Sequence, residues 1–406
     1  MQTDTSLWQW NRILKRYDYS SMNSINYDVA IIGLGAMGSA SAYHLARRGL
    51  RVIGFDRHSP PHDQGSSHGE TRIIREAYAE GVAYVKIVQR AYELWSELEE
   101  ESERELYLQT GGMMFGSDGS DMIAGAETSA VTHNLTFEKL SMDEVRQRYK
   151  IFNPNVDMTA IFDPRSGILY PESCVEAHLE LAKRHGAELL FGQPVVSWDS
   201  NSGSVTVRTE NGAYTAQSLI LAAGAWLPQL LNGLEVPLQV ERQVLMWYEP
   251  IANQELFRAE NCPIFIWDTG PGIHFYGFPD MGTGVKVARM HFGDTSTPEN
   301  LRRDADADDD APVRSFLEHF MPDVPGKLVS SRVCMFTNTP DEHFLIDLHP
   351  EYGNVVIASP CSGHGFKFAS AMGEILADLA TTGKSNFDIS MFGLDRFNNI
   401  NEQEIS

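Results

Sequence analysis

The chain has 406 residues, of which 42 % are hydrophobic and 21 % are charged, and its net charge at pH 7 is −23. The length predicts two domains or one elaborate domain, and the composition is that of an ordinary soluble globular protein. The negative charge argues against nucleic acid as a partner, since a phosphate backbone requires clustered Lys and Arg. An anionic substrate must therefore be held by local cations, against the overall field. No apolar run approaches the length that spans a bilayer, so we expect no membrane segment.

The four cysteines, Cys174, Cys262, Cys334 and Cys361, are far apart in the sequence. No C-x-x-C pair and no histidine at zinc spacing accompanies them, so the pattern predicts neither a disulfide framework nor a metal site. We therefore expect a reducing compartment, the cytoplasm. Residues 1–26 are polar and lack the apolar segment of a signal peptide, and we expect them to form a disordered tail.

A dinucleotide-binding pattern begins the folded part of the chain. Residues 28–32 are apolar and β-branched, which predicts a buried strand, and Gly33, Gly35 and Gly38 follow in G-x-G-x-x-G spacing. The first glycine permits a tight turn, the second lets a pyrophosphate approach the backbone, and the third lets the next helix pack on the strand. Asp56 ends a second predicted strand and can bond a ribose hydroxyl, which disfavours NADP and leaves FAD or NAD.

The segment 214–231 adds a further strand, then Ala223–Gly224–Ala225–Trp226, then an expected helix. An apolar strand that ends in these residues is typical of FAD enzymes of the glutathione-reductase type, where small residues let the chain pass close to the dinucleotide. An ordinary strand-to-helix turn is the alternative. Together with the amino-terminal glycines, the segment favours FAD over NAD and predicts that Gly224 contacts the cofactor.

A loop rich in Pro, Gly, Ser and His follows Asp56 and becomes cationic at Arg72 and Arg75. It is a candidate entrance to an active site, because functional residues concentrate on loops. The alternative is a solvated helix face on which the two arginines pair with Glu70 and Glu76.

Alternating apolar and polar residues between 234 and 295 predict an antiparallel sheet. Lys286 points away from Val285 and Val287 there, and the face that it occupies ordinarily meets water. If that face covers a cofactor instead, Lys286 is a buried cation of functional interest. The acidic run at 302–312 is expected to be a solvated loop.

Near the carboxyl terminus we predict a buried strand, a turn and a helix with an apolar stripe at Met372, Leu376 and Leu379. A helix N-terminus beside a cation stabilises negative charge, so this turn can bind and tune a reduced flavin. The alternative is a structural turn with a surface lysine. The residues of the turn that we expect to contact the cofactor are Gly363, His364, Gly365 and Lys367.

Taken together, these motifs resemble the monomeric sarcosine oxidase and N-methyltryptophan oxidase family. The resemblance extends from about Tyr27 to about Phe397 and is carried by GLGAMGSASAYHLARRG, PPHDQGSSHGETRIIREAY, AAGAW, CMFTNTPDEHFLIDLHP and SGHGFKFAS. It implies an α/β plus α+β fold, in which a glutathione-reductase-type, Rossmann-like FAD-binding domain is combined with an antiparallel-sheet substrate domain. We expect the first domain to comprise residues 27–113, 168–238 and 341–392, and the second to comprise residues 114–167 and 239–340.

The resemblance also implies an activity. Relatives of this kind are monomeric FAD-dependent oxidases of N-methyl or other secondary amino acids. They transfer a hydride equivalent from the C–N bond to flavin and then to O2, which gives an imine and hydrogen peroxide. Their flavin is attached covalently, through its 8α-methyl group, to a cysteine that corresponds to Cys334. If this attachment is absent, Cys334 is an ordinary core thiol; Cys361 is the rival attachment site.

Further site residues are implied by the same resemblance. Arg75 and Lys367 match the pair that holds the substrate carboxylate, and Tyr276 matches a tyrosine over the substrate. Lys286 matches a lysine that activates oxygen. The side chains beside the flavin correspond to His68 and Arg72.

The chain differs from sarcosine oxidases at several positions of these motifs. Met290 stands where they have histidine; His291 follows it and, by strand alternation, would face the other side unless a bulge intervenes. Phe336 replaces a tyrosine, and Pro360 and Cys361 replace small residues. These differences favour a larger or more apolar N-substituent than that of sarcosine.

Two alternatives to an oxidase remain at this point. A flavin amine dehydrogenase would pass electrons to another acceptor, which Lys286 argues against. A flavin-binding protein without activity is left open by Met290 and Phe336.

Overall fold

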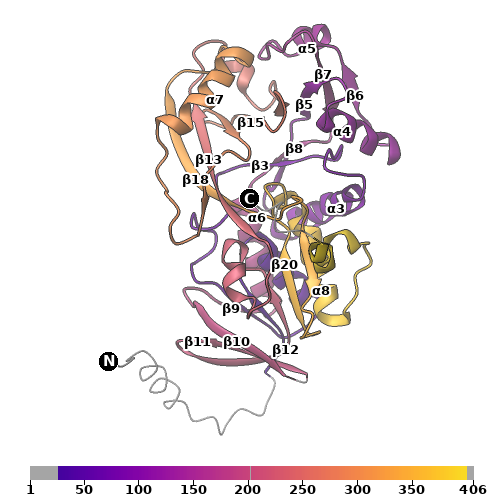
Figure 1. Cartoon of the computed structure of the whole chain (residues 1–406), viewed down its shortest axis with the longest axis vertical. Helices are drawn as coiled ribbons and strands as arrows, with labels where there is room; N and C mark the ends of the chain where they lie inside the picture. Colours follow the sequence, from indigo (N-terminus) through magenta and orange to yellow (C-terminus); the bar gives the residue numbers. More distant parts are fainter. Residues whose placement is uncertain (1–25, 202, 400–406) are drawn as a thin grey trace.

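The computed structural model describes residues 26–201 and 203–399, so residues 1–25 of the expected tail lie outside the described residues. Two large sheets follow one another along the long axis of the molecule (Figure 1). The sheet in the lower half of the view contains eight strands in the described part of the chain, in the order β10-β11-β12-β1-β2-β9, with β20 beside β12 and β19 beside β20. Their bounds are Tyr27–Ile32 for β1, Val52–Phe55 for β2, Glu188–Leu190 for β9, Val195–Asn201 for β10, Ser204–Thr209 for β11, Gly212–Leu221 for β12, Leu345–Leu348 for β19 and Val355–Ser359 for β20.

Strands β9, β2, β1, β12 and β20 of this sheet run parallel. Parallel strands are covered on both faces and are therefore apolar throughout, which explains the run that ends at Ile31 and Ile32. Helices α2, α3, α6 and α8 pack here; they span Ala36–Arg47, Tyr84–Ser102, Pro171–Arg184 and Ala369–Thr382.

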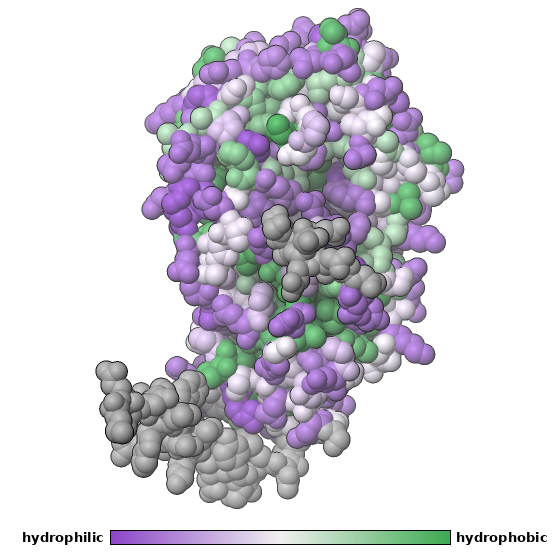
Figure 2. All heavy atoms as spheres, in the orientation of Figure 1, coloured by the Kyte–Doolittle hydropathy of each residue, from purple (hydrophilic) through white to green (hydrophobic). Residues whose placement is uncertain are grey.

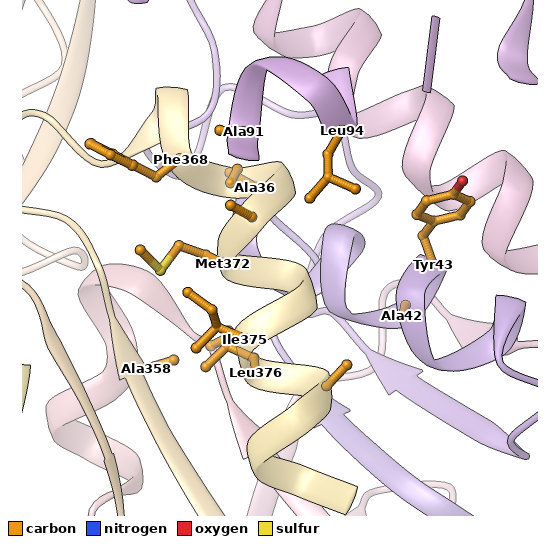
Figure 3. Close-up of a cluster of buried hydrophobic side chains, with 14 of the residues drawn as sticks. Ala36, Ala42, Tyr43, Ala91, Leu94, Ala358, Phe368, Met372, Ile375 and Leu376 are labelled. Atoms are coloured by element: carbon orange, nitrogen blue, oxygen red, sulfur yellow. The ribbon is translucent and has the colours of Figure 1, made fainter. Parts of the chain in front are cut away.

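Helix α8 packs closely against α2, and its apolar stripe faces the core (Figure 3). Met372 and Leu376 are fully buried, as the sequence pattern predicts. Gly373 makes the approach possible, because a Cβ at this position would lie 2.5 Å from the Cβ of Ala40. The first domain core is thus built around a small-residue helix contact.

The second sheet contains nine strands in the described residues, in the order β17-β13-β16-β15-β14-β5-β7-β6, with β18 paired to β13. All its pairs are antiparallel except β5 with β14, which are parallel. Strands β5 to β7 span Gly112–Ser117, Glu138–Leu140 and Met158–Asp163. The remaining strands β13 to β18 span Gln239–Tyr248, Ile264–Asp268, His274–Asp280, Val285–Arg289, Thr295–Ser296 and Leu328–Asn338. Helices α4, α5 and α7 accompany this sheet and span Asp121–Thr132, Met142–Arg148 and Ala307–Phe320.

A third, small sheet joins the two halves through β3, β4 and β8, which span Arg72–Ile74, Tyr107–Gln109 and Gly167–Leu169. The division into two domains remains a prediction, and the strands of the two large sheets follow it, although β5 crosses the expected boundary at 113/114. Short 3-10 helices η2 to η6 span Gly224–Leu230, Gln254–Phe257, Phe366–Phe368, Ser390–Phe392 and Leu394–Asn399.

One alternative and one local expectation were wrong. The alternative of a solvated helix face does not hold, because Arg72 lies on strand β3 and buried Arg75 pairs with Glu80 instead of Glu76. The helix expected after Ala223 is the 3-10 helix η2, which contains Pro228. The acidic run continues into helix α7, because the Asp306 carboxylate accepts hydrogen bonds from the first-turn amides and caps the helix.

Hydrophilic residues cover most of the face shown in Figure 2, and apolar residues gather below its centre, at the level of β20 and α8. Among the described residues, no helix combines the length and the apolarity that crossing a bilayer requires. The same part of the chain contains no group of three or more His, Cys, Asp and Glu side chains placed to hold a metal ion.

Candidate active site

A cavity of about 950 Å³ lies where the two large sheets meet. Its walls include residues at the carboxyl ends of β1, β2, β12 and β20 and residues of β13, β14, β15 and β18. Ligands of parallel α/β sheets bind outside the carboxyl ends of the strands, so the cavity lies where such a fold places its ligand. Most of the predicted site residues line it; Gly38, His68 and Lys286 do not.

The glycines at the end of β1 form a cradle. Gly33 has φ +93°, and a Cβ there would lie 2.4 Å from the carbonyl oxygen of Ala222. A Cβ at Gly38 would lie 1.8 Å from the oxygen of Gly33, so Gly38 lies behind the cavity wall and lets α2 begin against the turn. Gly33 and Gly35 line the cavity with their bare backbone, which fits the pyrophosphate of a dinucleotide such as FAD.

Asp56 and Gly224 lie near this cradle and line the cavity. The Asp56 carboxylate accepts hydrogen bonds from the amides of Leu34 at 2.9 Å and His58 at 2.8 Å, which fixes the turn after β1 to the end of β2. Gly224 has φ +54°, and a Cβ at this position would meet no atom within 4 Å, so the chain there leaves room for a ligand.

Arg75 and Lys367 lie on one wall of the cavity, and both are buried. Arg75 Nη2 donates to the Glu80 oxygens at 2.6 and 2.5 Å, and its guanidinium covers the ring of Tyr78 at 4.3 Å. Lys367 Nζ donates to the His364 oxygen at 2.6 Å. Burial, and then the positive charge of Arg75, lower the pKa of Lys367 to about 7, although Glu80 opposes the shift. The surface-lysine alternative for Lys367 is therefore wrong.

Glu80 is the carboxylate that balances these cations. Although burial raises its pKa, Arg75, His364 and Lys367 together lower the pKa of Glu80 to about 2, so the group is ionised at neutral pH. Glu80 was not among the residues predicted from the sequence, since an acid five residues after an arginine in a loop has no distinctive pattern.

The turn after β20 is held by hydrogen bonds of His364. The Tyr78 hydroxyl donates to His364 Nδ1 at 2.5 Å, and His364 Nε2 donates to the backbone carbonyl oxygen of Glu342 at 3.0 Å. This tautomer is neutral, because burial lowers the pKa of His364 to about 4. Gly365 is required here, since a Cβ would lie 1.7 Å from the Pro360 oxygen.

Lys286 is buried, so the water-facing alternative is wrong. Its Nζ donates to the oxygen of Gly69 at 2.7 Å and to the oxygen and Oγ1 of Thr71 at 2.9 and 3.0 Å. Nζ also lies 4.6 Å from the ring of Phe278, which lines the cavity. Burial, reinforced by Arg72, holds the pKa of Lys286 well below its usual value. Lys286 is thus one layer behind the wall instead of on it.

Arg72 lines the cavity, and His68 lies behind it. Arg72 Nη2 donates to the oxygens of Ser66 at 2.8 Å and His68 at 2.5 Å. His68 Nε2 is buried without a hydrogen-bond partner among the described residues. Burial, followed by the charge of Arg72, lowers the pKa of His68 to about 4, so this ring is neutral.

Cys334, Cys361 and Tyr276 also line the cavity. Cys334 is 3 % exposed, and its Sγ lies 3.8 Å from Arg72 Nη2. Burial raises the pKa of the Cys361 thiol to about 11, which makes it a poor nucleophile. Burial also raises the pKa of Tyr276, so its hydroxyl stays protonated.

Met290 and His291 both line the cavity. Strand β16 ends at Arg289, and His291 has φ +48°, so the chain leaves strand alternation before His291. His291 therefore reaches the cavity because its own backbone adopts the left-handed conformation after the strand has ended. No β-bulge within the strand is involved. Phe336 packs beside it, with ring centroids 5.4 Å apart.

Comparisons with known proteins agree with this architecture. The family model described as FAD dependent oxidoreductase matches residues 28–379. The monomeric sarcosine oxidase of Streptomyces avermitilis is 43 % identical over 373 residues, which cover 91 % of this chain and 97 % of the relative. The N-methyl-L-tryptophan oxidase of Yersinia pestis is 36 % identical over 375 residues, which cover 92 % of this chain and all of the relative.

Solved structures show the same fold. NikD, an unusual amino acid oxidase essential for nikkomycin biosynthesis, has in its Tyr258Phe mutant form a TM-score of 0.80 at 24 % identity and covers 91 % of this chain and 97 % of its own. L-proline dehydrogenase from P. horikoshii has a TM-score of 0.80 at 20 % identity and covers 92 % of this chain and 98 % of its own. The expected fold class is thus confirmed. The chain belongs to the FAD-dependent oxidoreductase family, in the group that contains the monomeric sarcosine oxidases and N-methyl-L-tryptophan oxidases.

Proposed function

We propose that the chain is an FAD-dependent oxidase of N-methyl or other secondary amino acids. The observation that carries this proposal is the pair of buried cations, Arg75 and Lys367, on one wall of the cavity. Buried cations require a partner anion, and Glu80 is the only carboxylate that hydrogen-bonds Arg75 in the described residues. In a chain of net charge −23, this wall suits the carboxylate of an amino acid, with Arg75 as a bidentate donor.

When bound, FAD would supply the redox chemistry, which is the two-electron oxidation of the substrate C–N bond and the reduction of O2. The products are an imine, which water converts to an aldehyde and an amine, and hydrogen peroxide. The cradle of Gly33 and Gly35 would hold the pyrophosphate, and Asp56 a ribose. We assign Gly224 and the turn at 363–365 to the same cofactor, because their backbone lines the cavity.

The protein positions and charges the substrate. Tyr276 and Phe336 form part of the wall of the cavity. Lys286 lies behind Phe278, and its protonated form would stabilise negative charge when O2 is reduced. Arg72 adds a second positive charge on the same side, and His68 supports Arg72 through its backbone oxygen. The apolar side chains of Met290 and Phe336 favour an N-substituent or side chain larger than that of sarcosine.

We further propose that FAD is bound covalently through Cys334. Support comes from the cavity-facing position of the thiol and from the guanidinium of Arg72 beside it, since an adjacent cation promotes reaction of a thiol as a nucleophile. The raised pKa of the Cys361 thiol disfavours the rival site.

All four cysteines are free, which supports a reducing compartment, and we propose the cytoplasm. We also propose a monomer that acts on small molecules. Its FAD domain comprises 27–113, 168–238 and 341–392, and its substrate domain comprises 114–167 and 239–340.

The test is oxygen uptake by purified, FAD-loaded protein. The panel contains sarcosine, N-methyl derivatives of larger amino acids, proline and pipecolate. Each N-methyl compound is compared with the primary amino acid from which it derives. We expect uptake with at least one secondary amino acid and at least tenfold less with the matching primary one. Absence of uptake across the panel would contradict the proposal.

A further inference from the structure

His291 lines the cavity and forms a hydrogen-bonded pair with buried Glu241, and the proposed function gives neither residue a role. His291 Nδ1 lies 3.0 Å from Glu241 Oε2. The same carboxylate accepts hydrogen bonds from Asn338 Nδ2 at 2.7 Å and from the amide of Gly293 at 3.3 Å. Glu241 is buried, and three donors surround its two carboxyl oxygens.

The hydrogen bonds determine which ring nitrogen of His291 is free. A carboxylate only accepts, so Nδ1 carries the proton that His291 donates to Glu241. Nε2 is then the free nitrogen, and no described residue forms a hydrogen bond with it. His291 lines the cavity with 22 % of its side chain exposed. A histidine oriented by a carboxylate in this way can take up a proton at Nε2.

His291 lies on the same wall as the proposed carboxylate anchor. The His291 ring is next to Phe336, and a Cβ at Gly363 would lie 2.9 Å from the Phe336 ring. Gly363 precedes His364, whose oxygen accepts from Lys367. The wall that Lys367 occupies therefore continues through Gly363 and Phe336 to His291.

The charges around His291 favour its protonated form. Burial lowers its pKa, but the hydrogen bond to Glu241 and the charges of Glu342 and Glu241 outweigh burial and raise the pKa above the ordinary value of 6.5. Glu342 comes from the loop before β19, and Glu241 from β13. A base is most effective when its pKa lies near the working pH.

We propose that His291, oriented by Glu241, is the base that takes the proton from the ammonium group of the bound substrate. This inference rests on the proposed function. An amino acid in water is an ammonium ion, whose nitrogen has no free electron pair to assist oxidation of the adjacent carbon. One N–H bond breaks, its electron pair stays on the amine nitrogen, and an N–H bond forms at Nε2. The imidazolium is balanced by Glu241 and returns the proton to water.

The first test measures kcat/KM against pH with the best secondary amino acid. In the wild type we expect kcat/KM to rise with pH through a single ionisation above 6.5. Glu241→Gln removes the balancing charge, so this rise should move to lower pH by roughly one to three units. In His291→Asn, the rise of kcat/KM with pH that belongs to His291 should disappear, and kcat/KM at neutral pH should fall by roughly 10² to 10⁴. The remaining pH dependence should follow only the ammonium ionisation of the free substrate.

The matched control is His185→Asn. His185 forms a similar pair with Glu101 at 2.8 Å, but on the surface, away from the cavity. Its pH profile should superimpose on that of the wild type. An unchanged profile in His291→Asn overturns the inference while the proposed function stands. Absence of turnover by the wild type overturns both.

A second readout does not depend on turnover or on the folding of Glu241→Gln. Histidine-selective ¹⁵N labelling reports the tautomer and the pKa of each imidazole, and the signals of His291 are those absent from His291→Asn. We expect an Nδ1–H tautomer and a pKa above 6.5. An Nε2–H tautomer, or a pKa below 6.5, overturns the inference.

Discussion

Buried Arg75 and partly exposed Glu80 form an ion pair, in which one guanidinium nitrogen donates to both carboxylate oxygens, at 2.6 and 2.5 Å. The Arg75 side chain is 5 % exposed and that of Glu80 is 30 % exposed, so Glu80 has access to water and Arg75 does not. An anion that enters the cavity therefore competes with Glu80 for a cation that cannot leave. We propose that this competition sets the affinity of the cavity for carboxylates.

Glu80→Gln weakens the competitor without a large change in shape. We expect affinity for a simple carboxylate, acetate, to increase roughly tenfold, because Arg75 and Lys367 lose their balancing charge. Stability should fall by about 2 kcal/mol, since a charge-assisted hydrogen bond is lost. Calorimetric titration and thermal unfolding measure both effects. Glu93→Gln, which removes an exposed partner of Arg90, is the control, and equal acetate affinity in both variants would contradict the account.

Lys367 predicts a pH dependence for the same affinity. Its pKa of about 7 lies below the ordinary lysine value, so the charge is present below pH 7 and is lost as pH rises through it. Acetate should therefore bind more weakly at pH 8.5 than at pH 6. Lys367→Arg keeps its charge over this range and should flatten the dependence. The same slope in both proteins would assign the effect to another group.

Lys286→Met tests the proposed oxygen step. Methionine approximates the length of lysine but leaves the oxygens of Gly69 and Thr71 without their donor. We expect oxygen-dependent turnover to fall roughly 10²- to 10³-fold, as for loss of one preorganised electrostatic group. Bleaching of the flavin by substrate without oxygen should change much less. Rapid-mixing absorbance separates the two steps, and equal losses in both would indicate a structural role.

Gly38→Ala tests the cofactor cradle. The added methyl would meet the backbone oxygen of Gly33 at 1.8 Å, and backbone on both sides cannot rotate away. We expect loss of bound FAD and destabilisation by roughly 3 kcal/mol. Gly353→Ala has nothing within 4 Å of the new methyl and should stay within about 0.5 kcal/mol of the wild type. Flavin content and urea unfolding compare the two variants.

Cys334→Ala and Cys361→Ala separate the two candidate attachment sites. Intact mass after denaturation should show one FAD added to the wild type and to Cys361→Ala, but not to Cys334→Ala. Both thiols line the cavity, so the two variants are matched in position. A wild-type mass without FAD, or loss of the adduct in Cys361→Ala, would refute attachment at Cys334.

The parts of the fold that could be predicted from the sequence are those determined by interactions between residues close together in the chain. The strand before Gly33, the glycine turn and helix α2 follow from apolar periodicity and from the close contacts that only glycine allows. The stripe of α8 is predicted by the same periodicity. By contrast, the capping of α7 by Asp306 was missed, because a run of aspartates also describes a solvated loop.

The candidate site was harder to predict, because its contacts join distant segments. Strand alternation assigned Lys286 to a face, but only the fold shows that Gly69 and Thr71 cover that face. Glu80 and the pair of Glu241 and His291 have no distinctive spacing, and His291 reaches the cavity through a left-handed backbone that no residue type signals. Arg75 pairs with Glu80, while the neighbouring Glu76 pairs with Arg165, and the sequence alone does not distinguish the two acids.

The most direct test of the central claim is oxygen uptake by FAD-loaded protein on its best N-methyl amino acid, with and without catalase. An oxidase that makes hydrogen peroxide should lose half of its net uptake when catalase is added, because catalase returns half of the oxygen consumed. Peroxide should match the substrate consumed. If no N-methyl amino acid supports uptake, while the same substrates reduce an artificial dye through the protein, the chain is a dehydrogenase and the claim is wrong.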